Sequence, residues 1–151
     1  ARQDMMAYLG GSSRIDVLLA AVKPTRLTVR GSDVCAVDIG STLQAPVAGV
    51  LASRRGDALR RCWDSQVGAE VPCSSAHSAE VISSPDTGTQ TCAQLAEGYL
   101  EAPLEDVRFD LRVLVVAGHP DECRIVVLGH NVPTASVRGL GTRAVPLVAA
   151  S

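Results

Sequence analysis

Cysteine and histidine stand four residues apart at two places in this sequence, a combination that could bind a metal. Cys73 precedes His77, and His119 precedes Cys123. Two sulfurs and two imidazoles form a tetrahedral ligand set that suits zinc. The spacing is not that of the common zinc motifs, however, and in an oxidising compartment both cysteines would be taken up by disulfides. We therefore expect no metal or other cofactor, and keep this set as an alternative.

A cysteine could also act as a nucleophile, with Cys73 or Cys35 attacking and His77 or His130 as the base. That chemistry needs a free thiolate, a base within reach and an oxyanion hole, and the sequence indicates none of the three. The serine pairs also lack the G-x-S-x-G motif of serine hydrolases. We therefore expect a protein that is not an enzyme. A thiol-dependent enzyme or a Cys/His metal protein remains the alternative.

The segment from Arg61 to Ile82 must position several of these residues. Its strand-forming stretches E-V-P (70–72) and E-V-I (80–82) are separated by a polar turn. Two cysteines a hairpin's length apart can approach within bridging distance across neighbouring strands. We therefore predict a disulfide between Cys62 and Cys73 that staples a small β element.

Trp63 is the single tryptophan of the chain and lies next to this bridge in the sequence. An aromatic side chain in a protein poor in aromatics could anchor a binding partner. It could instead pack on the Cys62–Cys73 bridge, which is the reading we favour. The candidate binding surface consists of Trp63 and the polar-turn residues Ser74, Ser75 and His77.

The composition favours an α+β protein with a packed core. Of the 151 residues, 46% are hydrophobic but only 3% are aromatic. The core must therefore consist of Val, Leu, Ile and Ala, which favour sheet with a little helix. We expect one compact domain over residues 1–151, with antiparallel sheet and one packed helix in each half.

Charge and cysteine content narrow the partners and the compartment. A net charge of −2 and a pI of 5.9 argue against nucleic acid. No apolar run reaches the roughly 18 residues that span a bilayer, so we do not expect an integral membrane domain. Five cysteines without a CxxC motif favour a secreted or extracytoplasmic protein. The sequence opens at Ala1 rather than at methionine, which is compatible with removal of an export signal.

Hydrophobic periodicity predicts two helices, at residues 2–9 before Gly10 and at residues 92–101 before Pro103. Residues 54–61 are polar, and their arginine pairs are expected on a solvated face. The predicted strands are a buried one at 15–22 and shorter or half-exposed ones at 26–30, 34–39, 70–72, 80–82, 107–116 and 123–128.

Two parts of the sequence, about 1–52 and 62–151, joined by 53–61, resemble variants of one unit. Each contains a helix ending in Tyr-Leu, strands with Asp-x-Cys-x-[Val/Ile]-x-[Val/Ile], and then Val-x-Gly. The matching residues are Tyr8-Leu9, Asp33 to Ile39 and Val47 to Gly49 in the first half, and Tyr99-Leu100, Asp121 to Val127 and Val137 to Gly139 in the second. We therefore predict an internal duplication.

The duplication predicts how the other cysteines pair. Cys92 opens the second helix seven residues before Tyr99, whereas Ala1 stands seven residues before Tyr8. We therefore predict a disulfide between Cys92 and Cys123, which leaves Cys35 as a free thiol. Because Cys35 could pair with Cys35 of another copy, a homodimer is kept as an alternative oligomeric state.

At these residues the chain resembles the actinobacterial "septum formation" family of exported envelope proteins. The resemblance covers roughly residues 61–141, and one departure is that residues 114–118 hold no counterpart of the family's usual tryptophan before the last cysteine. The shared pattern is a cysteine before V-x-C-x-x-x-H-x-x-E-V, then a cysteine-bearing helix, a late strand and a small-residue segment: Cys62, Val71, Cys73, His77, Glu80, Val81, Cys92, Tyr99, Cys123, Ile125 and Ser136 to Gly139.

The resemblance implies an extracytoplasmic, disulfide-bearing, non-catalytic module. Its expected partner is a protein or a cell-wall component, and the family name suggests a link to cell division.

Overall fold

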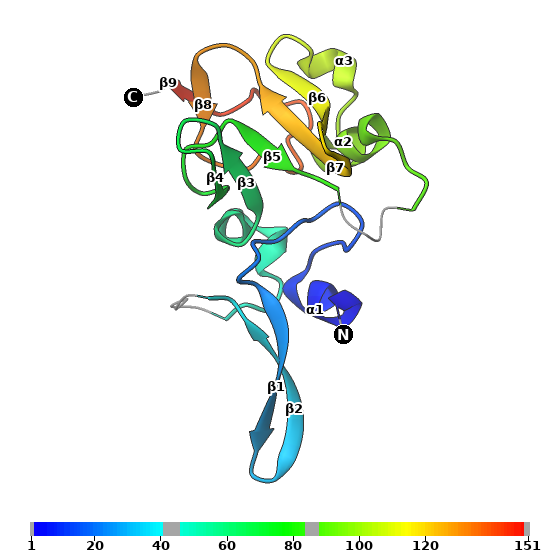
Figure 1. Cartoon of the computed structure of the whole chain (residues 1–151), viewed down its shortest axis with the longest axis vertical. Coiled ribbons are helices and arrows are strands. Elements are labelled where there is room, and N and C mark those ends of the chain that lie inside the picture. Colours follow the sequence, from blue (N-terminus) through cyan, green and yellow to red (C-terminus); the bar gives the residue numbers. More distant parts are fainter. Residues whose placement is uncertain (1, 41–45, 84–87, 150–151) are drawn as a thin grey trace.

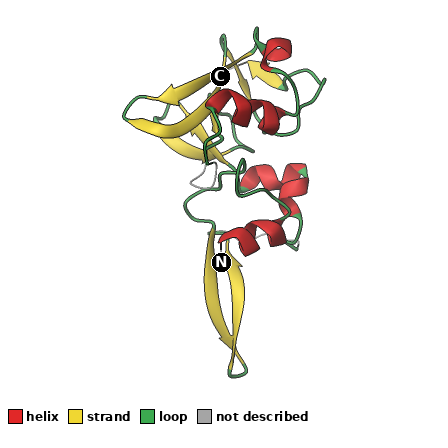
Figure 2. Ribbon diagram, turned by 90° about the vertical axis from the view of Figure 1, so that its right-hand side faces the viewer, coloured by secondary structure: helices red, strands yellow, loops and turns green. Residues whose placement is uncertain are grey.

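The computed structural model describes residues 2–40, 46–83 and 88–149. It is a mixed α/β protein with antiparallel sheets and few helices, as the composition predicted. A slender two-stranded hairpin projects from a larger body that holds the remaining strands (Figure 1), and the same projection is seen after a quarter turn (Figure 2). The described segments of the first half thus contribute much less sheet to the body than those of the second.

The first half begins with α1 (Arg2–Leu9), which was predicted with these bounds and ends at Gly10. The hairpin follows as β1 (Lys23–Val29) and β2 (Ser32–Asp38). Its turn consists of Arg30 and Gly31, both at positive φ, and Val29 pairs with Ser32. Positive φ at both central residues gives the turn a twist that matches the twist of the strands.

The strand predicted at residues 15–22 is wrong. Val17, Leu18 and Val22 are buried, but the segment consists of turns and irregular backbone and forms one isolated bridge, between Leu18 and Arg60. A continuous apolar run indicates burial without fixing the backbone conformation, since it lacks the period that separates strand from helix.

Two short 3₁₀ helices, η1 (Val50–Ala52) and η2 (Arg54–Ala58), lead into the second half. The expected solvated face of arginines is only partly correct. Arg54 and Arg55 are exposed, whereas Arg60 is 3% exposed and belongs to the interior.

The second half forms a five-stranded antiparallel sheet with the order β4-β3-β5-β7-β6. The helix α2 (Cys92–Leu100) covers one face and begins with a capping box between Thr91 and Gln94. The other elements are β3 (Arg61–Asp64), β4 (Ala69–Pro72), β5 (Ala79–Val81), α3 (Leu104–Val107), β6 (Leu111–Val116), β7 (His119–Val127), β8 (Asn131–Pro133) and β9 (Leu147–Ala149).

The strand predicted at residues 107–116 starts later than expected. Residues 104–107 form α3 after Pro103, and Phe109 is 77% exposed, so the apparent alternation through Phe109 does not reflect a strand. The structure does not confirm two repeated halves, because the hairpin forms a sheet of two strands and the second half a sheet of five.

Candidate functional site

Both predicted disulfides are present. Cys62 and Cys73 join β3 to the end of β4 with a Cα–Cα distance of 5.1 Å, and Cys92 and Cys123 join the start of α2 to β7 at 5.4 Å. Cys35 has a free thiol and lies exposed on β2. Two disulfides fit an extracytoplasmic protein, because cytosolic thiols are kept reduced.

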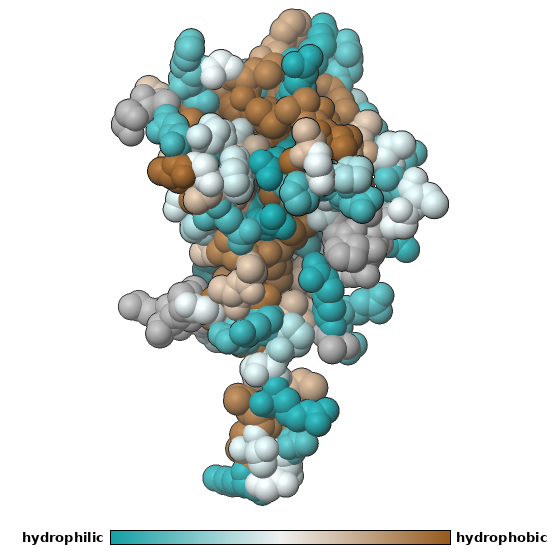
Figure 3. Space-filling model, viewed as in Figure 1, coloured by the Kyte–Doolittle hydropathy of each residue, from teal (hydrophilic) through white to brown (hydrophobic). Residues whose placement is uncertain are grey.

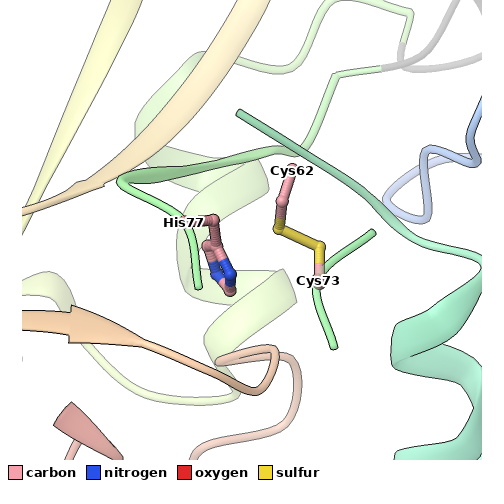
Figure 4. A group of neighbouring side chains, drawn as sticks. All are labelled: Cys62, Cys73 and His77. Carbon is pink, nitrogen blue, oxygen red and sulfur yellow. A yellow bond between two sulfur atoms is a disulfide. The ribbon is translucent and has the colours of Figure 1, made fainter. Parts of the chain in front are cut away.

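His77 lies beside the Cys62–Cys73 bridge, as Figure 4 shows. In the described part of the chain, this is the one group of three potential metal ligands whose donor atoms lie within 4.8 Å of one another. The two sulfurs are bonded to each other, however, so neither is the thiolate that zinc requires. The group is therefore a disulfide with a neighbouring imidazole.

The structure does not bring together the alternative metal set of Cys73, His77, His119 and Cys123. Cys73 and Cys123 belong to different disulfides, His77 is buried, and His119 is exposed. Each Cys/His pair is close in sequence, but the two cysteines belong to separate disulfides in different parts of the sheet.

His77 is instead the outer member of a buried hydrogen-bond network. Its Nδ1 lies 2.7 Å from the Ser75 carbonyl oxygen, and its Nε2 lies 3.3 Å from Glu80 Oε1. A carbonyl accepts but cannot donate, so Nδ1 carries a proton toward Ser75. This contact fixes the imidazole ring against β5.

Glu80 is the centre of this network and is 1% exposed. The Tyr99 hydroxyl donates to Oε2 at 2.8 Å, the Ser136 hydroxyl contacts the same oxygen at 2.8 Å, and the Val137 N–H donates to Oε1 at 2.7 Å. A buried carboxylate is tolerated only when it is paired or hydrogen-bonded in this way. Glu80 thereby ties β5 to α2 and to residues 136–137.

Burial, followed by the nearby Glu80 carboxylate, raises the pKa of Tyr99 well above its ordinary value. The Tyr99 hydroxyl therefore keeps its proton at pH values where an exposed tyrosine ionises, and remains a hydrogen-bond donor to Glu80. The resemblance included Glu80, Tyr99 and the small-residue segment that begins at Ser136, but no spacing rule predicts the contact of Ser136 with Glu80, 56 residues away. Both carboxylate oxygens of Glu80 already accept hydrogen bonds, so we assign Glu80 a structural role.

A second buried network is centred on Arg60 and reaches the second half through Asp57, whose Oδ2 accepts from the Ser136 N–H. The Nε of Arg60 lies 3.1 Å from Asp16 Oδ1, its Nη1 lies 3.1 Å from Asp57 Oδ1, and its Nη2 donates to the Leu51 carbonyl at 2.6 Å. Burial raises the pKa of Asp57, although the Ser136 N–H and the charge of Arg60 oppose this shift. The guanidinium compensates two buried carboxylates from different segments.

Trp63 does not pack on the Cys62–Cys73 bridge, so that expectation is wrong. Adjacent strand residues point to opposite faces, and Cys62, paired with Glu80, faces α2. Trp63 consequently lies on the open face, where the Arg124 guanidinium stacks 4.6 Å from its ring centre. The partial exposure of Trp63 arises from this placement.

Trp63 lines a groove of about 780 Å³ on the open face of the sheet. Figure 3 shows apolar side chains gathered over β6 and β7 on this side of the molecule. We call this the Trp63 groove; its main lining residues are Trp63, Ser78, Leu114, Val116, Arg124, Val126 and His130.

The predicted binding surface is only partly assembled. Ser74 and Ser75 are exposed at the turn after Cys73, but His77 is buried and cannot contact a partner. The sequence missed Arg124 and Leu114, whose only signal was their alternation with the buried residues of β7 and β6.

The structure does not assemble a cysteine nucleophile with a histidine base from the four candidate residues. Cys73 is bonded to Cys62, His77 is buried, Cys35 lies on the projecting hairpin, and His130 lies in the second half.

No helix in the described segments has the length and apolarity needed to cross a membrane. No family model, curated protein or solved structure matches the chain.

Proposed function

We propose that this protein is an exported, disulfide-stapled, non-catalytic binding module that contacts another protein through the Trp63 groove. The carrying observation is that a half-buried tryptophan and exposed apolar side chains lie on a sheet face that α2 does not cover. Leu114 is 42% exposed there, and the half-buried Val126 also lines the groove. Tryptophan with surrounding apolar side chains is the usual centre of a protein–protein contact.

The charges around the groove favour a protein over an anionic polymer. Arg124 is held by Glu122, with Nη2 2.6 Å from Oε1, and stacks on Trp63. Its positive charge is therefore paired with a carboxylate, and the ring and guanidinium form one flat platform. The groove is also open to solvent, unlike the deep clefts that enclose small molecules.

Export and a role in the envelope are supported by different observations. Two disulfides favour an oxidising compartment, and they join β3 to the residue after β4 and α2 to β7, around the sheet that carries the groove. The resemblance of residues 61–141 to the septum formation family favours an envelope protein linked to cell division. Cell-wall material is the competing ligand.

We also propose that the two halves are variants of one helix–hairpin–turn unit. The Gly49 N–H donates to the Tyr8 carbonyl at 2.9 Å, and the Gly139 N–H donates to the Tyr99 carbonyl at 2.8 Å. Both glycines have positive φ, 67° and 61°. These contacts lie at the positions that the sequence pattern matched, which supports the duplication independently of the cysteines.

The test of the binding function is capture of envelope proteins by the immobilised chain and by its Trp63→Ala and Phe109→Ala variants. Phe109 is a matched control because it is exposed and stacks with Arg108 at 4.5 Å, as Trp63 does with Arg124. The captured protein is identified and purified, and its affinity is then measured from Trp63 fluorescence, since the chain has one tryptophan.

We expect Trp63→Ala to weaken this binding by about tenfold or more, the effect of losing a central aromatic anchor, with Phe109→Ala unchanged. The Trp63→Ala affinity is read by calorimetry. Equal losses in both variants, or binding to isolated wall material instead of a protein, would contradict the proposal.

A further inference from the structure

The hairpin of the first half is left unusually exposed for a sheet element. Leu27, Val29 and Val34 are each at least 40% exposed, and among the described residues β1 and β2 form a sheet of two strands. An isolated two-stranded hairpin is marginally stable in water and normally gains a third strand or a covering helix. One edge of this hairpin is therefore suited to accept another strand.

One open edge of the hairpin belongs to β2. Because a two-residue turn closes the hairpin at Val29 and Ser32, alternate residues of β2 pair with β1 and the others direct their N–H and C=O groups away from it. The outward residues are Asp33, Cys35 and Val37. Within the described ranges, no strand pairs with this edge.

A groove runs beside this edge, between α1 and the hairpin. Its lining includes Met5, Tyr8, Cys35, Val37 and Val47. The positions that match these residues in the second half all belong to its buried core: Ala96, Tyr99, Cys123, Ile125 and Val137. The same surface that is a groove in the first half is thus filled in the second.

The element that fills it is β5 with the residue that follows. Glu80 lies opposite Ile125 of β7, and the Ile82 N–H donates to the Cys123 carbonyl at 3.0 Å. Ile82 is fully buried in the core, while the Glu80 carboxylate accepts from Tyr99 and Val137. The second half therefore shows what an added strand at the matching edge must carry.

We infer that the β2 edge binds an extended polypeptide segment that pairs antiparallel with β2 and carries a glutamate followed by two β-branched residues. The glutamate lies opposite Val37, within reach of the Tyr8 hydroxyl. The second β-branched residue lies over the groove beside Cys35. The inference rests on the proposed likeness of the two halves and not on the Trp63 groove.

The charges at this groove agree with an acidic strand. Arg26 lines it, is 77% exposed in its side chain, and lies 3.6 Å from the Asp33 carboxylate. Asp4 also lines the groove, on α1. Arg26 and the Tyr8 hydroxyl supply the donors for the incoming carboxylate, in a groove that is otherwise mostly apolar.

The experiment uses the 151-residue chain and a synthetic peptide, Ala-His-Ser-Ala-Glu-Val-Ile-Ser, the sequence of residues 76–83. Its affinity is measured with a fluorescent label, and amide hydrogen exchange locates the contact. We expect the amides of Asp33, Cys35 and Val37 to become protected. Glutamine in place of the peptide's glutamate should weaken binding about tenfold, the effect of losing one charge-assisted hydrogen bond.

Tyr8→Phe is the matched protein variant, because it removes only the hydroxyl. It should weaken the glutamate peptide about tenfold and leave the glutamine peptide unchanged, since the two changes remove the same contact. Trp63→Ala should bind the peptide normally, which separates this site from the Trp63 groove. Absence of protection on β2, equal loss for both peptides, or pairing of two copies through β2 in sedimentation would overturn the inference.

Discussion

Each half contains a helix and a β-hairpin, but the two halves differ in how completely the hairpin is covered. In the second half β7 has a neighbour on each side, and Tyr99 is 1% exposed against Glu80. In the first half β2 pairs only with β1 among the described strands, and Tyr8 is 54% exposed. A helix packed on a hairpin therefore makes a closed core only when a third strand supplies both an apolar side chain and a carboxylate.

The largest predicted effect on stability comes from replacing Arg60, in the segment that connects the two halves. Arg60→Ala would leave Asp16 and Asp57 as buried carboxylates without their main counter-charge. Losing one partner of a buried ion pair costs about 3–5 kcal/mol, because the remaining charge stays desolvated. We expect the free energy of unfolding in urea to fall by about this amount.

Arg55→Ala is the control for this change. Arg55 is exposed and makes one hydrogen bond, to the Pro46 carbonyl. Its replacement should alter stability by no more than about 0.5 kcal/mol, as for most surface changes. A loss below about 1 kcal/mol in Arg60→Ala would show that the Arg60 network does not hold the halves together.

The next largest effect on stability comes from the cysteines, which differ between the halves: Cys92 and Cys123 are bridged, whereas Cys35 is a free thiol. The Cys92–Cys123 disulfide closes a long loop, with a sequence separation of 31. Replacing both cysteines by serine should cost about 3–4 kcal/mol in the chain-entropy model. Cys35→Ser should leave stability unchanged, because the Cys35 thiol is exposed and unbridged.

Mass spectrometry after thiol labelling without reductant checks the premise of that comparison. We expect one label, on Cys35. Labels on Cys73 and Cys123 would mean that the bridges do not form in the protein as isolated, and would reopen the thiol and metal alternatives. A disulfide-linked dimer in non-reducing electrophoresis would identify a Cys35 pair between copies.

The sequence predicted local elements well where their limits are chemical. Gly10 ends α1, and Thr91 and Pro103 bound α2, because left-handed backbone, a capping hydroxyl and a ring without an N–H act over one turn. It failed at residues 15–22, where tertiary contacts with Leu59 and Arg60 decide the backbone conformation.

The site was predicted less completely than the fold. The Cys62–Cys73 pairing followed from strand spacing, which is local. The orientation of Trp63 depends on which face of the sheet α2 covers, and the burial of His77 depends on Glu80. Both depend on contacts between residues distant in sequence, such as Glu80 with Ser136, and no spacing rule contains them.

The smallest predicted effect compares two tyrosines at matching positions. Tyr99→Phe removes one donor from the buried Glu80 carboxylate, which should lower the free energy of unfolding by about 1–3 kcal/mol. Tyr8→Phe should change it by less than about 0.5 kcal/mol, because the Tyr8 side chain is exposed. Similar losses in both variants would mean that the first half is also closed.

Alkaline pH sharpens this last comparison. Burial raises the pKa of Tyr99 in the folded protein, so above the unfolded value of about 10 the unfolded chain releases a proton that the folded chain keeps. The stability that Tyr99 contributes is therefore fully present below pH 10 and declines as the pH rises further. We expect the difference between the wild type and Tyr99→Phe to shrink above pH 10 in urea titrations. A difference that stays constant up to the onset of alkaline unfolding would show that the Tyr99 hydroxyl is not held as a buried donor to Glu80.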